Sequence, residues 1–211
     1  MPMRYTWITD PPIERLVLAA DVVVAANALD HIVNLTTGSL DANLLDLNSS
    51  VRYSDICEDM RDRANNHFGD YEFYVYRISG TPVVLMAIST IAKYQEYIPG
   101  GGVWIEGTIA SPYVVGGGIL MKEYAVNLSR QKGYAGRIGC AAASDEAQSS
   151  WERMGMEATG RMYVEENDGD QYEFPVLFLD PATKPAIWEP HGGGWIFRNM
   201  RYTMSSEKSL V

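Results

Sequence analysis

The spacing of apolar residues predicts two helices at the start of the chain. Apolar residues recur every three or four positions over residues 13–33, which is typical of an amphipathic helix, and residues 34–50 are expected to form a loop. Asp55, with Glu58 three residues later, forms a capping-box pattern that predicts a second helix over residues 55–68. The charged side chains of this second helix, which we expect on a solvated face, are Glu58, Asp59, Arg61, Asp62 and Arg63.

After residue 70 the pattern becomes typical of a β-rich fold. Aromatic and β-branched residues alternate with polar ones, and glycine or proline marks most of the breaks. Strands are predicted over residues 71–79, 81–91, 103–110, 137–143, 159–165 and 172–179, and helices over residues 118–131 and 145–154. The strand, glycine turn, helix and strand from residue 103 to residue 143 form a βαβ unit, whose two strands should be parallel. The predicted fold class is therefore α/β (α+β), with a mixed sheet and the element order ααβββαβαββ.

The length and the even composition of the chain predict a single domain. With 211 residues the chain is long enough for one sizeable core, and no linker-like stretch divides it. We expect residues 1–70 to supply the leading helices, residues 71–180 the core sheet, and residues 181–211 a C-terminal tail that packs on the core. Within the tail, the tryptophan-rich residues 187–197 could provide the contact surface of a homodimer.

The charge balance makes nucleic acid an unlikely partner. The chain has 17 Lys and Arg against 27 Asp and Glu, a formal net charge of −10, whereas binding a polyanion relies on clustered cations. An acidic surface suits an amine-bearing substrate, either a small molecule or a protein. Acidic faces that are only solvated are also common, so both interpretations stay open.

The remaining composition predicts a cytoplasmic protein that has no membrane span and binds no metal. The first residues lack the basic start, apolar core and cleavage site of a signal peptide. The most apolar stretch, residues 16–29, is shorter than a membrane span and contains Asp21. Cys57 and Cys140 lie far apart and share no metal-ligand spacing with the histidines, so we expect two reduced structural thiols.

The segment with the clearest chemistry is the turn Gly116-Gly117-Gly118, between a predicted strand and a predicted helix. Glycine lets another group approach the backbone closely, and the first N–H groups of a helix have no intrahelical partners. Such a turn can hold a phosphate against the positive end of the helix dipole. A purely structural turn is the alternative, because glycine turns before helices are common.

The surroundings of this turn resemble the GNAT superfamily of N-acetyltransferases. Pro112, the Gly116-x-Gly118 spacing and an apolar helix that ends at Gly133 follow the order of that family's acetyl-CoA loop, and a later helix ends in the segment Trp151–Met156. The resemblance covers roughly residues 71–180 and implies a twisted mixed sheet with helices on both faces. It also implies acetyl-CoA as co-substrate and direct attack of an amine on the thioester.

The resemblance implies roles for particular residues. Backbone N–H groups of the turn would hold the CoA pyrophosphate, and the end of the preceding strand would pair with the pantetheine arm. The binding residues so implied are Thr108, Ile109, Ala110, Val114, Val115, Gly116, Gly117, Gly118 and Ile119. Glu106 would be the general base, with a paired or exposed strand carboxylate as the alternative. Tyr163 is a candidate acid for the leaving thiolate, as is Tyr124, and core packing is the alternative for both.

Two positions depart from the family pattern. Tyr113 stands where the loop normally has Arg or Gln, and Trp151 stands where a tyrosine commonly protonates the thiolate. The expected function is an acetyl-CoA-dependent N-acetyltransferase, with a catalytically degenerate GNAT-fold binding or structural protein as the alternative. A GNAT-like enzyme that modifies nucleic acid is a third hypothesis, which the net charge disfavours.

Overall fold

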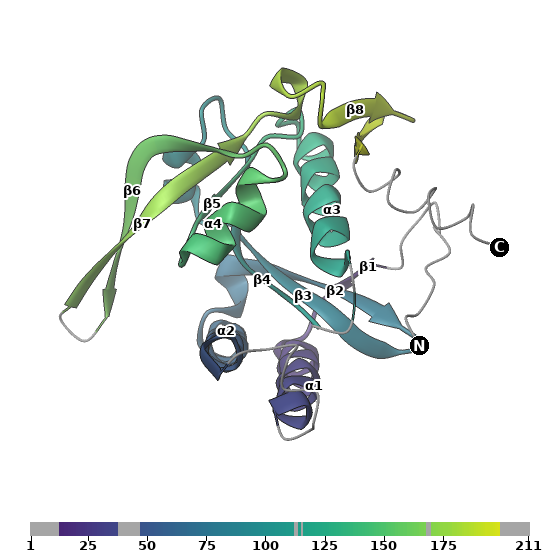
Figure 1. Cartoon of the computed structure of the whole chain (residues 1–211), viewed down its shortest axis with the longest axis vertical. Helices are drawn as coiled ribbons and strands as arrows, with labels where there is room; N and C mark the ends of the chain where they lie inside the picture. Colours follow the sequence, from purple (N-terminus) through teal and green to yellow (C-terminus); the bar gives the residue numbers. More distant parts are fainter. Residues whose placement is uncertain (1–12, 38–46, 112–113, 115, 168–169, 199–211) are drawn as a thin grey trace. The chain divides into compact units, whose positions relative to one another are not determined.

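A mixed sheet with helices is the main feature of the computed structural model, which describes residues 13–37, 47–111, 114, 116–167 and 170–198 (Figure 1). Its strands are β1 (Ile13–Leu16), β2 (Tyr71–Ile78), β3 (Thr81–Ser89), β4 (Val103–Ala110), β5 (Ile138–Ala141), β6 (Glu157–Asn167), β7 (Asp170–Leu179), β8 (Trp188–His191) and β9 (Gly194–Phe197). Its helices are α1 (Ala19–Thr37), α2 (Leu47–Asn66), α3 (Gly117–Gln131) and α4 (Asp145–Glu152), with the 3₁₀ helices η1 (Phe68–Asp70), η2 (Ala92–Tyr97) and η3 (Pro181–Thr183).

The strand pairing confirms the predicted α/β class with a mixed sheet. The order is β1-β2-β3-β4-β5-β7-β6, and β8 and β9 form a separate two-stranded sheet. β4 and β5, the strands of the predicted βαβ unit, are parallel. The pairs β1–β2, β2–β3, β5–β7 and β6–β7 are antiparallel.

The chain divides into two compact units. The first comprises Met1–Thr90 and Glu106–Met121, and the second comprises Ile91–Ile105 and Lys122–Val211. β4 and α3 each contribute residues to both units.

In the first unit, α1 and α2 cover one face of the strands. Phe73 and Val75 of β2 and Leu85 and Ala87 of β3 face these helices, because alternate residues of a strand point to the same side. The buried helical residues that meet them are Val22, Ala25, Ala26, Leu29, Cys57, Met60 and Ala64. This core holds α2 firmly in place, and α2 supplies a charged side chain to the candidate site.

The β2–β3 hairpin was predicted from Gly80, and the structure confirms it. Ser79 and Gly80 have φ angles of 51° and 82°. These are the left-handed values that a two-residue hairpin turn requires. The predicted boundaries of both strands are close to those observed because the turn chemistry is local.

The predictions for the two leading helices were wrong at their starts. Residues Ile13–Leu16 form β1 instead of the first helical turn, and they pair with β2 from Ile13↔Tyr76 to Leu16↔Phe73. α1 begins only at Ala19. A segment of four residues cannot distinguish a strand from a helix by periodicity, and its pairing partner lies far along the chain. α2 begins at Leu47, within the predicted loop, so the capping-box pattern at Asp55 does not mark its start.

In the second unit, the first residues of β4 pair with β5, and β6 and β7 form a long hairpin. The β8–β9 hairpin is held by two side chains of α3. Glu123 Oε2 accepts a hydrogen bond from the Phe197 N–H at 2.7 Å, and Asn127 Oδ1 accepts one from the Trp195 N–H at 2.8 Å. Asn127 Nδ2 also donates to the Trp195 carbonyl at 2.9 Å. Two helical side chains thus recognise the backbone of β9.

Candidate functional site

Glu106, the predicted general base, lies on β4 in the first unit and forms a buried ion pair. Its Oε1 is 3.1 Å from Nη1 of Arg63, which projects from α2. The Glu106 side chain is 6% exposed and the Arg63 side chain 15%. The charged residues of α2 were predicted to form a solvated face, and for Arg63 that prediction was wrong.

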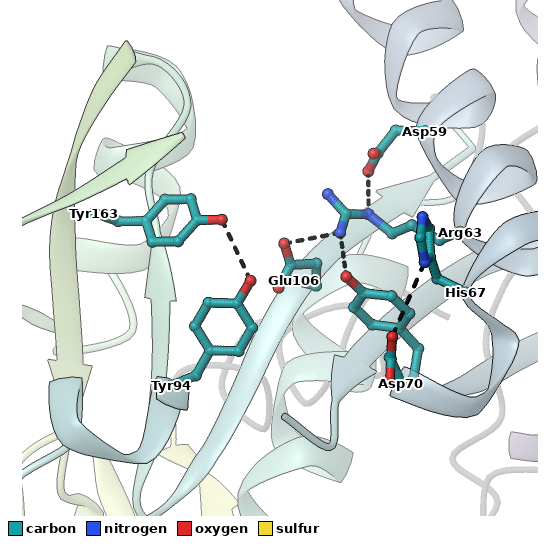
Figure 2. A network of polar contacts seen from close by, with 8 residues as sticks. Asp59, Arg63, His67, Asp70, Tyr94, Glu106 and Tyr163 are labelled. Atoms are coloured by element: carbon teal, nitrogen blue, oxygen red, sulfur yellow. Dashed lines mark hydrogen bonds and ion pairs between the residues drawn. The ribbon is translucent and has the colours of Figure 1, made fainter. Parts of the chain in front are cut away.

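Arg63 is held by two further residues (Figure 2). Its Nε donates to Asp59 Oδ2 at 2.8 Å, and its Nη1 donates to the Tyr71 hydroxyl at 2.7 Å. The guanidinium carbon also lies 5.1 Å from the centre of the Tyr71 ring. Burial alone would lower the pKa of Arg63, but the hydrogen bond to Asp59 and the charge of Glu106 outweigh burial and raise it. Burial also raises the pKa of Tyr71.

The glycine turn leads into α3, and its three glycines have different physical reasons to be glycine. Gly116 has a φ of 83°, which favours glycine at that position. A Cβ on Gly117 would come within 2.9 Å of both Val114 and Val84, so packing excludes a side chain there. A Cβ on Gly118 would lie 3.8 Å from the Ala110 Cβ, an ordinary contact. Neither backbone strain nor packing therefore requires glycine at position 118.

The N–H groups of the turn fall into those that donate a backbone hydrogen bond and those that precede the first intrahelical bond. Val114 donates its N–H to the Ser111 carbonyl at 3.0 Å, and Leu120 donates to the Gly116 carbonyl at 3.0 Å as the first intrahelical bond. The N–H groups of Gly117, Gly118 and Ile119 precede that bond and have no intrahelical partners. Val115, also predicted to bind, and Tyr113 lie outside the described residues.

The end of β4 carries a buried polar group. The Thr108 hydroxyl oxygen is buried and has no hydrogen-bond partner among the residues that the structure describes. Ile109 faces the opposite way, into the core beneath α1 and α2. The parallel register of β4 with β5 covers the three residues Val103–Ile105, and β4 continues as far as Ala110.

Tyr163, the candidate acid, belongs to the second unit. It lies on β6 among other aromatic rings, and its hydroxyl is 3.3 Å from that of Tyr94. Trp104 stacks on Tyr94 with ring centres 5.2 Å apart, and the ring centres of Tyr97 and Tyr163 are 6.2 Å apart. Figure 2 shows the two hydroxyl groups pointing toward each other. This arrangement fits the packing role that the sequence left open for Tyr163.

Comparison with known proteins gives a result only at the level of structure. No protein-family model matches the chain, and no curated protein does. Among solved structures, a GCN5-related N-acetyltransferase from Rhodopseudomonas palustris matches at 14% identity and a TM-score of 0.53, over 82% of this chain and 98% of that one. A protein from Desulfovibrio desulfuricans assigned to the GNAT family matches at 16% identity and a TM-score of 0.52, over 81% of this chain and 99% of that one.

The chain has the GNAT fold. At these identities the likeness concerns the fold, and the function must be argued from the site itself. The GNAT resemblance predicted from the glycine turn is therefore confirmed for the fold. The first unit of this GNAT fold brings together the predicted base Glu106, the described binding residues of β4, and those of the glycine turn.

The sequence did not reveal a buried lysine in the second unit of the GNAT fold. Lys122 of α3 is 7% exposed, donates to the Ser150 hydroxyl at 2.9 Å, and lies 3.7 Å from the centre of the Trp151 ring. Burial lowers the pKa of Lys122 to about 8, opposed by Cys140 and reinforced by Arg153.

In the described part of the chain, no three His, Cys, Asp or Glu side chains are grouped so as to hold a metal ion. Cys57 and Cys140 are buried free thiols, and burial raises the pKa of each to about 12. No helix within the described residues has both the length and the apolar character of a membrane span.

Proposed function

We propose that the protein is an acetyl-CoA-dependent N-acetyltransferase that acts on an amine. The observation that carries this proposal is Gly118, a glycine in the first turn of α3 that neither strain nor packing requires. Glycine inside a helix is about 1 kcal/mol less favourable than alanine, so a reason for it is expected. Close approach of a ligand to the helix N-terminus supplies that reason.

The glycine turn is the proposed site for the CoA pyrophosphate. The N–H groups of Gly117, Gly118 and Ile119 precede the first intrahelical bond, and the helix dipole favours an anion at that end. The Val114 N–H is already used within the turn. Backbone groups alone would therefore hold the pyrophosphate, with Gly118 leaving room for it.

The end of β4 is the proposed site for the pantetheine arm. An amide-bearing chain can lie along a strand and exchange hydrogen bonds with its backbone, as in β-augmentation. The residues offered are Thr108, Ile109 and Ala110, beyond the part of β4 that pairs with β5. The Thr108 hydroxyl is a further donor and acceptor at this place, and an unpartnered buried hydroxyl is costly unless a ligand or water satisfies it.

Glu106 is the proposed general base for the acceptor amine. Its carboxylate would take a proton from the acceptor ammonium, after which the free amine attacks the thioester carbonyl. The C–N bond then forms, the C–S bond breaks, and the CoA thiolate leaves with the electron pair of the C–S bond. The second proton that the nitrogen loses goes to this thiolate, which gives the neutral amide and the CoA thiol. The role of Tyr163 as the acid stays a prediction, and its described contacts are with other aromatic rings.

Release of the CoA thiol on incubation with acetyl-CoA and a panel of amines tests this proposal. Wild-type protein should release thiol faster with at least one amine than without any. Glu106→Gln should lower kcat about 100-fold, and Glu58→Gln, an exposed glutamate on α2, should leave it unchanged. CoA binding without thiol release for any amine would favour a degenerate binding protein. Full activity of Glu106→Gln would show that Glu106 is not the general base, while the proposed acetyltransferase activity would stand.

A further inference from the structure

Side chains from three separate elements of the first unit meet at the Arg63 guanidinium. Arg63 and Asp59 come from α2, and Glu106 comes from β4 (Figure 2). Tyr71 comes from β2. The chain uses four polar side chains here to fix one ion pair. Such an arrangement needs an explanation beyond the general packing of the fold.

Stability does not supply that explanation. Removing two charges from water costs about as much as their attraction returns, so a buried ion pair is weak evidence for a stabilising role. Arg61, on the same helix, pairs with Asp30 at 3.1 Å and joins α2 to α1 in a more exposed position. The helix is therefore already tied to its neighbour without Arg63.

The guanidinium of Arg63 is fixed on more than one side. Asp59 accepts from Nε, the Tyr71 hydroxyl accepts from Nη1, and the Tyr71 ring lies 5.1 Å from the guanidinium carbon. A planar guanidinium held in this way has little freedom to rotate, and its hydrogen bonds point in set directions. The Glu106 carboxylate, whose Oε1 is 3.1 Å from Arg63 Nη1, is consequently fixed in position next to a permanent positive charge.

We propose that Arg63 is the positioning residue of Glu106, orienting the carboxylate and keeping it ionised for proton transfer from the acceptor amine. This inference rests on the proposed function, in which Glu106 is the base. During the transfer an N–H bond of the ammonium breaks and an O–H bond forms on Glu106, and Arg63 keeps its own protons. The raised pKa of Arg63 supports this division of roles.

The charges around the pair decide what loss of Arg63 would do. Asp59 on α2 and Glu106 on β4 are both acidic, and Tyr71 on β2 is the other titratable group in contact with Arg63. His67 and Asp70, 4.0 Å apart, are more than half exposed and lie at the end of α2 and in η1. Without the guanidinium, Glu106 would lose its neighbouring cation, so it would take up a proton at higher pH.

A double-mutant cycle in kcat tests the inference. Arg63→Met should lower kcat at least about tenfold in the wild-type background, and less than about twofold in a Glu106→Gln background, because a positioning residue acts only through its partner. In the wild-type background, the acid limb of the kcat/KM profile should also move up by about one pH unit. Arg63→Lys, which keeps the charge, should restore that limb.

Three controls separate positioning from a structural role. Arg61→Met, the matched change at the Asp30 pair, should leave kcat and the acid limb unchanged, and His67→Gln should leave the limb in place. Thermal unfolding should show each variant folded at the assay temperature. If Arg63→Met does not fold, Tyr71→Phe and Asp59→Asn can replace it, because each removes one contact to Arg63. Each should lower kcat by a smaller factor in the wild-type background and have little effect in the Glu106→Gln background.

The outcomes distinguish this inference from the proposed function. Equal losses from Arg63→Met in both backgrounds, or an acid limb that does not move, would overturn the positioning role while Glu106 remains the base. If Glu106→Gln itself keeps full activity, the proposed base fails first, and the positioning role fails with it. A non-additive loss of kcat, together with an acid limb that moves to higher pH, would support both Glu106 as the base and Arg63 as its positioning residue.

Discussion

Lys122→Met replaces a buried ammonium group on α3 by an apolar side chain of similar length. Lys122 has no carboxylate partner among the described residues, and its contacts are the Ser150 hydroxyl and the Trp151 ring. The substitution removes the charge while largely keeping the volume. We expect the variant to be more stable than the wild type at pH 7.

The magnitude follows from the pKa of Lys122, which burial lowers from 10.5 to about 8. One pH unit is equivalent to about 1.4 kcal/mol, so the charged lysine is about 3 kcal/mol less favourable in the folded chain than in the unfolded one. Methionine loses the hydrogen bond to Ser150 and the cation–π contact with Trp151, each about 1 kcal/mol. The net gain at pH 7 should be about 1 kcal/mol.

Urea unfolding between pH 7 and pH 10.5 provides the assay. Below the folded pKa of about 8 the burial cost is fully present, and it disappears as the pH rises to 10.5, where the unfolded lysine also loses its proton. The wild type should therefore gain up to about 3 kcal/mol relative to Lys122→Met over this range. The stability difference should change sign.

Lys132→Met, at an exposed lysine just after α3, is the matched control and should show no such trend. The reasoning would be refuted by a Lys122→Met variant that is less stable at pH 7 by an amount that does not change with pH. That result would mean that the pKa of Lys122 is the same in the folded and the unfolded chain, so that burial does not lower it.

Two further predictions concern the glycine turn and β4. Gly117→Ala should destabilise the protein by about 1–3 kcal/mol in urea unfolding, because its Cβ would meet Val114 and Val84 at 2.9 Å; an unchanged midpoint would contradict the tight packing of the turn. Thr108→Val should leave the free energy of unfolding unchanged or raise it, because it removes a buried hydroxyl without a partner. The same variant should raise the KM for acetyl-CoA, and an unchanged KM would show that the hydroxyl does not contact the co-substrate.

Local sequence signals predicted much of the fold. The β2–β3 hairpin follows from the left-handed turn at Gly80, and α3 follows from the glycine turn and the apolar stripe behind it. β1 was missed because its conformation depends on pairing with β2, far along the chain. The start of α2 was missed because a capping-box pattern can occur inside a helix whose packing continues beyond it.

The candidate site was only partly visible in the sequence. The glycine turn was predicted from its local pattern, and the resemblance to the GNAT superfamily implied Glu106 on the preceding strand. Arg63 was assigned to a solvated face because nothing near it in the sequence indicates that β4 places a carboxylate beside it. The burial of Lys122 likewise depends on Ser150 and Trp151, which come from α4. Contacts between distant segments set both environments, and no local pattern encodes them.

Calorimetric titration of CoA into the wild type and into Gly118→Glu tests the central claim most directly. The wild type should bind with a Kd below about 1 mM, and Gly118→Glu should bind more than tenfold more weakly, because its carboxylate would stand against the pyrophosphate. Gly69→Glu, which adds the same charge at an exposed position with open space around it, should bind like the wild type. No binding by the wild type at about 1 mM, or equal affinity of Gly118→Glu, would contradict the assignment of the glycine turn to CoA.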